Sequence, residues 1–174
     1  MHQNLAAVFS FSAIMISTVG ARPGEGSAAP SAKYDARVDA PQSAASSCDA
    51  SLWNHVYSPK RLQQVSPCMS VTGVITESNA DADGDQHFLL KLDPGQDKLL
   101  NKRNNKKKSG DLVLEIVCAN PTSMRKPKSA CAGYTNRITI PRVGAHVRAT
   151  GTYVIDSHNG WAEIHPVSKL EAIK

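Results

Sequence analysis

Aromatic residues are scarce in this chain, and the motifs of several large enzyme classes are missing. Only 5% of the 174 residues are Phe, Trp or Tyr. The sequence contains no G-x-S-x-G, no H-E-x-x-H and no glycine-rich phosphate loop, which argues against serine hydrolases, zinc proteases and P-loop nucleotide-binding proteins. A chain of this length is also too short for a typical (β/α)8 barrel or a two-domain dehydrogenase. We therefore expect one small domain.

Long apolar runs are also missing, apart from one at the N-terminus. Residues 5–19 are almost all apolar or small, and Val19-Gly20-Ala21 supplies small residues for a cleavage site. This pattern predicts a signal peptide over residues 1–21, with a short uncleaved anchor as the alternative. No run of about 18 apolar residues follows, so we expect no membrane span after cleavage. Residues 22–47 are rich in Ala, Ser, Pro and Gly, so we expect a flexible linker there and a folded domain over residues 48–174.

Four cysteines are present: Cys48, Cys68, Cys118 and Cys131. An exported protein meets an oxidising environment, in which an even number of cysteines favours disulfides. We expect the pairs Cys48–Cys68 and Cys118–Cys131, because each brackets one irregular segment. A four-thiolate metal site is the rival interpretation, but no C-x2-C spacing supports it. The cysteines and the signal peptide together predict a secreted or periplasmic protein.

Alternating and β-branched segments dominate the predicted domain, and no convincing long helix is present. The pattern predicts five principal strands, at residues 69–76, 86–92, 111–118, 145–155 and 161–167. Gly73 and Gly151 fall inside two of them, where small closed β architectures need kinks. The sequence therefore favours an all-β fold, a small five-stranded Greek-key barrel of OB type, with a small sandwich as the alternative. Residues 136–140 could add a short strand.

Three stretches carry a resemblance to a known family. They are residues 52–62 (LWNHVYSPKRL), residues 71–74 with 83–87 (VTGV and DGDQH), and residues 151–156 with 160–167 (GTYVID and GWAEIHPV). They resemble a family of small exported bacterial proteins with a predicted OB-like domain that ends in a GWxEIHPV motif. The family has a histidine directly before its Gly-Trp pair, whereas Asn159 stands there in this chain. The resemblance implies an OB-like fold and export, and no established activity.

Five polar or aromatic residues are predicted to gather on one outer face of the sheet. Strand alternation places them opposite the apolar faces: His87, Glu115, Trp161, Glu163 and His165. OB-type barrels usually bind their ligands on that side. Three interpretations compete: a hydrogen-bonded network that braces the sheet, a ligand-binding surface with Trp161 as a stacking platform, and a metal or acid–base site formed by the two histidines and two glutamates.

Basic residues form two clusters outside the predicted strands. The first comprises Lys98, Lys102, Arg103, Lys106, Lys107 and Lys108, and the second comprises Arg125, Lys126 and Lys128. In an OB-type domain, basic loops at the binding face suit a nucleic-acid phosphate chain or another anionic polymer. Lys102 and Arg103 therefore join the candidate binding residues. A solvated, flexible loop around residues 101–105 is the plainer interpretation.

The functional interpretation follows from these patterns. Residues 81–85 (DADGD) resemble half of a calcium loop without the later bidentate glutamate, so we interpret them as a turn and expect no cofactor. The favoured function is an exported OB-like binding or accessory module without catalysis, whose partner is an anionic polymer or oligonucleotide. The alternatives are a metal-dependent, nuclease-like hydrolase that uses the His/Glu residues, and a purely structural exported domain.

Overall fold

The computed structural model describes residues 47–174, so the predicted signal peptide and nearly all of the predicted linker lie outside the described residues. Its elements are η1 (Ala50–His55), η2 (Pro59–Arg61), β1 (Leu62–Ala80), β2 (Gln86–Leu92), η3 (Asp97–Leu99), α1 (Lys102–Lys107), β3 (Leu112–Ile116), α2 (Arg125–Ala130), β4 (His146–Asp156) and β5 (Ala162–Ala172). The prediction of a largely β protein is confirmed. The first and last strands are longer than predicted.

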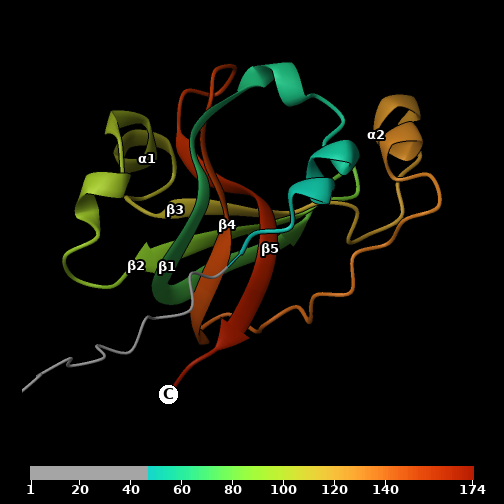
Figure 1. Cartoon of the computed structure of the whole chain (residues 1–174). Helices are drawn as coiled ribbons and strands as arrows, with labels where there is room; N and C mark the ends of the chain where they lie inside the picture. The colour runs from blue at the N-terminus through green and yellow to red at the C-terminus, as the bar shows by residue number, and fades with distance from the viewer. Residues whose placement is uncertain (1–46) are drawn as a thin grey trace, which may run out of the picture. The chain divides into compact units, whose positions relative to one another are not determined.

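Each strand pairs with two neighbours, and the order β1-β2-β3-β5-β4 closes back on β1 (Figure 1). All neighbouring pairs are antiparallel except β3 and β5, which run parallel over a short stretch. The long strand β1 pairs with β4 along its first part and with β2 along its second. The two pairings overlap at Gly73 and Val74, and an added Cβ at Gly73 would lie 2.3 Å from the carbonyl oxygen of Lys91. Only glycine tolerates that close approach.

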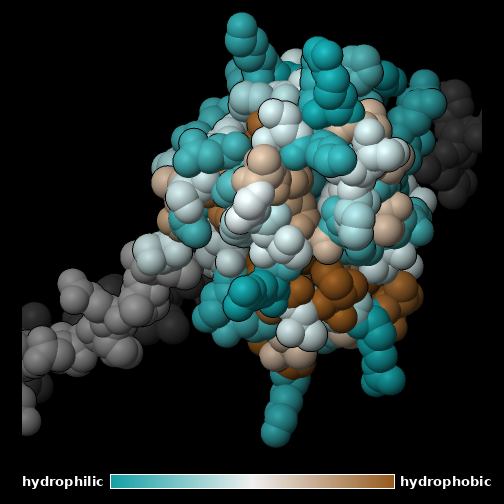
Figure 2. Space-filling model, turned by 90° about the vertical axis from the view of Figure 1, so that its right-hand side faces the viewer, coloured by the Kyte–Doolittle hydropathy of each residue, from teal (hydrophilic) through white to brown (hydrophobic). Residues whose placement is uncertain are grey.

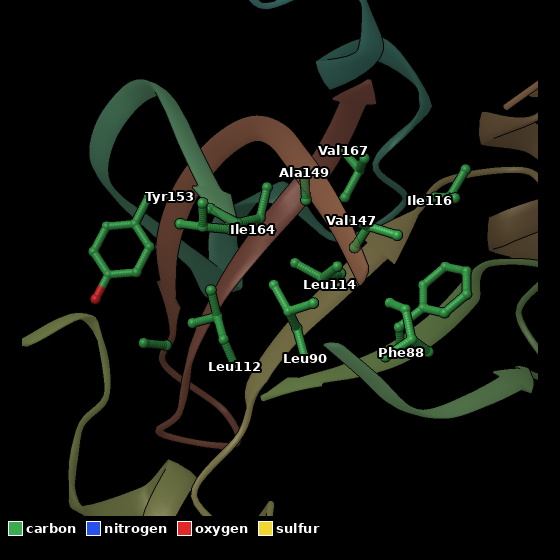
Figure 3. Close-up of a cluster of buried hydrophobic side chains, with 13 residues drawn as sticks. Phe88, Leu90, Leu112, Leu114, Ile116, Val147, Ala149, Tyr153, Ile164 and Val167 are labelled. Atoms are coloured by element: carbon green, nitrogen blue, oxygen red, sulfur yellow. The ribbon is translucent and has the colours of Figure 1, made fainter. Parts of the chain in front are cut away.

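The inner face of the strands forms one apolar core (Figure 3). Strand β3 contributes Leu112, Leu114 and Ile116, which alternate as predicted and are fully buried. Phe88 and Leu90 of β2 pack with them. Burying a side chain of this kind contributes about 1.5–3 kcal/mol to folding. The core therefore holds the strands in register and fixes the positions of the side chains on their outer faces.

A second, smaller apolar cluster covers part of the outer face of the strands. Leu52 and Val56, from the segment around η1, pack there with Val117 and Val154. Consecutive side chains of an extended chain point to opposite faces, so Ile116 packs in the core and the next residue, Val117, packs in this outer cluster. The outer face is therefore shielded from solvent where η1 and its neighbours lie over it.

Both predicted disulfides are confirmed. Cys48–Cys68 ties the segment before η1 to β1, and Cys118–Cys131 ties the chain after β3 to the end of α2. Two disulfides fit an extracellular or periplasmic location. Within residues 47–174, no helix is both long and apolar enough to cross a membrane.

The predicted short strand at residues 136–140 is wrong, because this segment forms no strand. The backbone N–H of Asn136 donates to the carbonyl oxygen of Cys118. The side-chain oxygen of Asn136 accepts a hydrogen bond of 3.0 Å from the N–H of Ile138. Such local side-chain bonds satisfy the backbone in place of a strand ladder.

The expected flexible loop at residues 101–105 is also wrong, because Asn101 caps helix α1 and the residues after it form the helix. Asn101 caps this helix and forms a reciprocal capping box with Asn104. Helices α1 and α2 lie on opposite sides of the strands (Figure 1). The face on the α2 side is largely hydrophilic, with its hydrophobic surface gathered in the lower part of the view (Figure 2). The two basic clusters therefore occupy separate regions of the molecule.

Candidate functional site

Three strands bring the predicted histidines and glutamates together. His87 of β2 pairs with Glu115 of β3, while Glu163 and His165 lie on β5, beside β3. Glu115 bridges the two histidines: its Oε1 is 3.5 Å from His87 Nδ1 and its Oε2 is 2.9 Å from His165 Nδ1. The Oε1 atom of Glu163 is 3.1 Å from the same His165 nitrogen. We call these four residues the His/Glu cluster.

The His/Glu cluster is buried, so of the three interpretations the open ligand-binding surface does not fit these four residues. All four have exposed fractions of 7% or less. The segment around η1 packs beside them on the outer face, where Leu52 and Val56 contact Val154, the strand partner of Glu163. The sequence could not show this packing, because it comes from a distant part of the chain. An extended polymer therefore has no direct access to the cluster.

Trp161 and Lys108 lie at one side of the His/Glu cluster. The indole Nε1 of Trp161 donates a hydrogen bond of 2.8 Å to Glu163 Oε2. The Nζ atom of Lys108 lies 4.1 Å from the centre of the Trp161 ring and 3.2 Å from His87 Nε2. This is a cation–π contact on one face of the indole. Lys108 therefore occupies one face of the indole, and the predicted stacking of a ligand on Trp161 would need the opposite face.

Asp85 is a member of this region that the predicted site did not include. Its exposed fraction is 4%, and its Oδ1 accepts a hydrogen bond of 2.8 Å from the backbone N–H of Cys118. The predicted turn at residues 81–85 is confirmed, since Asp81 N–H donates to the Asp85 carbonyl. One sequence signal could have found this residue: Asp85 precedes His87 by two positions, a spacing that puts both side chains on one face of an extended chain.

Burial and charge shift the pKa values of the acidic groups in opposite directions. Burial raises the pKa of Asp85 to about 7 and also raises the pKa of Glu163. Burial acts in the same direction on Glu115, but the neighbouring His165 outweighs it and holds the pKa of Glu115 below its usual range. Burial disfavours the charged form of His165, yet Glu115 raises the pKa of this histidine well above its usual value. Glu115 and His165 therefore form a buried ion pair.

The structure places the predicted binding residues Lys102 and Arg103 away from this pair, on the exposed surface of α1. Within residues 47–174, neither side chain has a hydrogen bond or ion pair to the His/Glu cluster. The Nε atom of Arg103 instead donates to the carbonyl oxygen of Asn159, at 3.2 Å. Arg103 therefore lies against the turn that connects β4 to β5 and leads into Trp161.

Asn104 fixes α1 to the strands. It is fully buried, and its Nδ2 donates to the carbonyl oxygens of Asp111 and Ala162 at 3.0 and 2.9 Å. Its Oδ1 accepts from the backbone N–H of Ala162 at 2.9 Å. The Nδ2 of Asn101 adds a bond of 3.0 Å to the carbonyl oxygen of Gly160. The basic helix is thus held at a defined position beside the β4–β5 turn.

Comparison with known proteins finds no match: no protein-family model matches the chain, and neither does any curated protein. The site itself must therefore carry the functional argument. It consists of two parts, the buried His/Glu cluster with Asp85 and the exposed basic helix α1.

Proposed function

We propose that this chain is an exported OB-type module that binds a polyanionic chain through helix α1. The observation that carries the proposal is a set of cationic side chains on one fixed helix: Lys102, Arg103, Lys106 and Lys107. All four are exposed, and no carboxylate within residues 47–174 forms an ion pair with any of them. Uncompensated cations at the surface attract phosphate groups.

The anchoring of α1 supports a binding role over that of a solvated loop. A flexible loop would lose conformational freedom on binding, whereas a helix fixed by Asn104 presents its cations in place. The neighbouring β4–β5 turn leads to Trp161, so a half-buried aromatic ring lies beside the cations of α1. Cations and an aromatic ring side by side are the usual elements of a surface for single-stranded nucleic acid or a similar polymer.

The topology and the cysteines support the remainder of the proposal. A closed order of β1-β2-β3-β5-β4 fits a five-stranded Greek-key barrel of OB type, in which the loops between strands 1 and 2 and between strands 4 and 5 border the binding face. Helix α1 lies against the second of these loops. Two disulfides and the apolar pattern of residues 5–19 fit export.

The test measures the anisotropy of a labelled twelve-nucleotide oligo(dT) as the protein is added at several salt concentrations. Four cations that neutralise four phosphates give a slope of log K against log salt of about −3. The triple variant Lys102→Gln/Lys106→Gln/Lys107→Gln should reduce that slope by about 2. A phosphodiester polymer of the cell envelope, used as an unlabelled competitor, distinguishes the two sources of this chemistry by its relative affinity.

Helix α2 offers a control with the same change in charge. Arg125, Lys126 and Lys128 are also exposed, but α2 lies on the other side of the strands. The variant Arg125→Gln/Lys126→Gln/Lys128→Gln should keep the salt slope of the native chain. Equal losses in both triple variants would mean that net charge alone attracts the polymer. Absence of binding at low salt would favour the purely structural alternative.

A further inference from the structure

A pocket beside the Cys118–Cys131 disulfide takes no part in the proposed function. It lies between the chain that follows β3 and helix α2, and its volume is about 740 Å³. Known sites for small molecules span about 300–1,000 Å³, so this pocket has room for one such molecule. We propose that it binds a small organic anion with an apolar body.

The walls of the pocket are fixed to the rest of the fold. The disulfide joins the segment after β3 to the end of α2. On one side, the backbone N–H of Asn120 and the Oγ1 of Thr122 donate to carbonyl oxygens in the turn between β1 and β2, each at 2.7 Å. On the other side, the ring of Tyr134 stacks on His55, with 3.8 Å between the ring centroids. A pocket whose walls are already held in place loses little conformational freedom when a ligand binds.

Two cations of α2 line the pocket and supply its charge. Arg125, Lys128 and Ser129 all belong to the lining, at the spacing i, i+3 and i+4 that puts side chains on one face of a helix. Both cationic side chains are exposed, and neither has an ion pair within residues 47–174. Of the lining residues, all of which lie in the described part of the chain, none is acidic. The pocket therefore favours a ligand with a negative group.

Much of the remaining lining is apolar, and it selects the body of the ligand. It comprises the disulfide, a proline, an aromatic ring and two alanines: Cys118, Cys131, Pro121, Tyr134, Ala119 and Ala132. Contact with this surface removes apolar area of a ligand from water, which favours binding. A free inorganic phosphate would leave the apolar lining unused, and an uncharged ring would leave the two cations unused. The combination favours an aromatic or aliphatic carboxylate or sulfonate.

Fluorescence titration of the full chain with anilinonaphthalene sulfonate tests the proposal. This probe joins a sulfonate to an apolar ring system, and N-phenylnaphthylamine is its counterpart without the charge. We expect the native chain to bind one molecule of either probe per chain, because both present the same apolar body to the pocket. Only the sulfonate probe should depend on the cations.

Two lysines of the same helix provide a matched pair of variants. Lys128→Gln removes a cation of the lining, and it should weaken binding of the sulfonate probe by about 10-fold, because a hydrogen bond between charged groups is lost. The affinity for N-phenylnaphthylamine should not change. Lys126→Gln makes the same change in charge at a residue that does not line the pocket, and it should leave the affinity for both probes unchanged.

A third variant fills the pocket. Ala132 is exposed and belongs to the lining, so Ala132→Trp adds a large ring there without replacing a core residue, and it should weaken binding of both probes. If this variant does not fold by circular dichroism, the two lysine variants decide alone.

Three results would overturn the proposal. They are the absence of saturable binding of the sulfonate probe by the native chain, equal losses in Lys128→Gln and Lys126→Gln, and unchanged binding of both probes by a folded Ala132→Trp. Lys128→Gln should keep the salt slope of oligonucleotide binding, which is measured separately. The pocket and the polymer surface of α1 can therefore each fail without the other.

Discussion

Helix α1 and the His/Glu cluster both carry charged groups, but those of α1 are exposed and those of the cluster are buried. The cations of α1 are exposed and have no acidic partners within residues 47–174. The charged groups of the cluster are buried and bonded to one another. Lys108 connects the two regions, because it follows α1 and its Nζ reaches His87 and the Trp161 ring.

The difference follows from solvation. An exposed lysine keeps its hydration shell, so it can remain unpaired at little cost in free energy and can bind a phosphate group. A buried carboxylate has lost its water and must find a proton, a cation or a hydrogen-bond donor inside the protein. The exposed region can therefore be a binding surface as it stands. The buried region instead bonds its charged groups to one another, chiefly Glu115 to His165.

The largest effect is expected from breaking the buried ion pair. Glu115→Gln removes the charge that His165 faces at 2.9 Å and leaves a buried imidazolium with a weaker partner. Loss of one member of a buried pair typically costs about 3–5 kcal/mol. Urea denaturation followed by circular dichroism should show a decrease of this size. A decrease below 1 kcal/mol would mean that Glu115 and His165 are not charged together in the folded protein.

The anchor of α1 should have the next largest effect. Asn104→Ala removes the side chain that bonds both the N–H and the carbonyl of Ala162, and it should lower the free energy of unfolding by about 2 kcal/mol. Oligonucleotide affinity should fall as well, because the cations lose their fixed position. The matched control is the exposed neighbour Asn105, whose change to Ala should leave stability within about 0.5 kcal/mol. Equal effects at both positions would contradict the anchoring role.

Glu163→Gln sharpens the comparison inside the His/Glu cluster. Burial raises the pKa of Glu163 and so favours its uncharged form, whereas His165 holds the pKa of Glu115 below its usual range. Glu163→Gln turns one of its two accepting oxygens into an amide nitrogen that faces an N–H donor, and it should cost about 1–3 kcal/mol, below the cost at Glu115. Parallel denaturation curves of the two variants measure the difference. A larger loss for Glu163→Gln would reverse the assignment of the ion pair.

The smallest effect on stability is expected at the surface of α1. Lys106→Gln should change the free energy of unfolding by less than about 0.5 kcal/mol, because the side chain is exposed and unpaired. The same variant should reduce the salt slope of oligonucleotide binding by about 0.7. Thermal denaturation and anisotropy measure the two quantities. A clear loss of stability without a change in slope would assign Lys106 a structural role.

Local patterns predicted much of this molecule. The bounds of β2, the alternation of β3 and both disulfides follow from periodicity and spacing within short segments. The same alternation correctly assigned His87 and Glu115 to one face, because neighbouring strands share their inward and outward directions. The resemblance to exported proteins with an OB-like domain remains a prediction.

The sequence patterns could not predict how distant segments pack against one another. The apolar packing beside the His/Glu cluster comes from residues around η1, and nothing in their local pattern indicates which face they pack on. The buried position of Asn104 was missed for a similar reason, since its partner Ala162 lies in a distant strand. Asp85 lies in a turn as predicted, but its buried position close to Glu115 and His165 was missed, although its spacing from His87 was visible. All three omissions concern burial, which depends on the whole fold.

The most direct test of the binding account is a map of backbone amide shifts in ¹H–¹⁵N spectra as oligo(dT) is added at low salt. If the polymer binds through α1, the largest shifts lie in α1 and in the β4–β5 turn up to Trp161, and they decrease as salt is raised. Shifts centred on α2, or spread evenly over the exposed lysines, would contradict it.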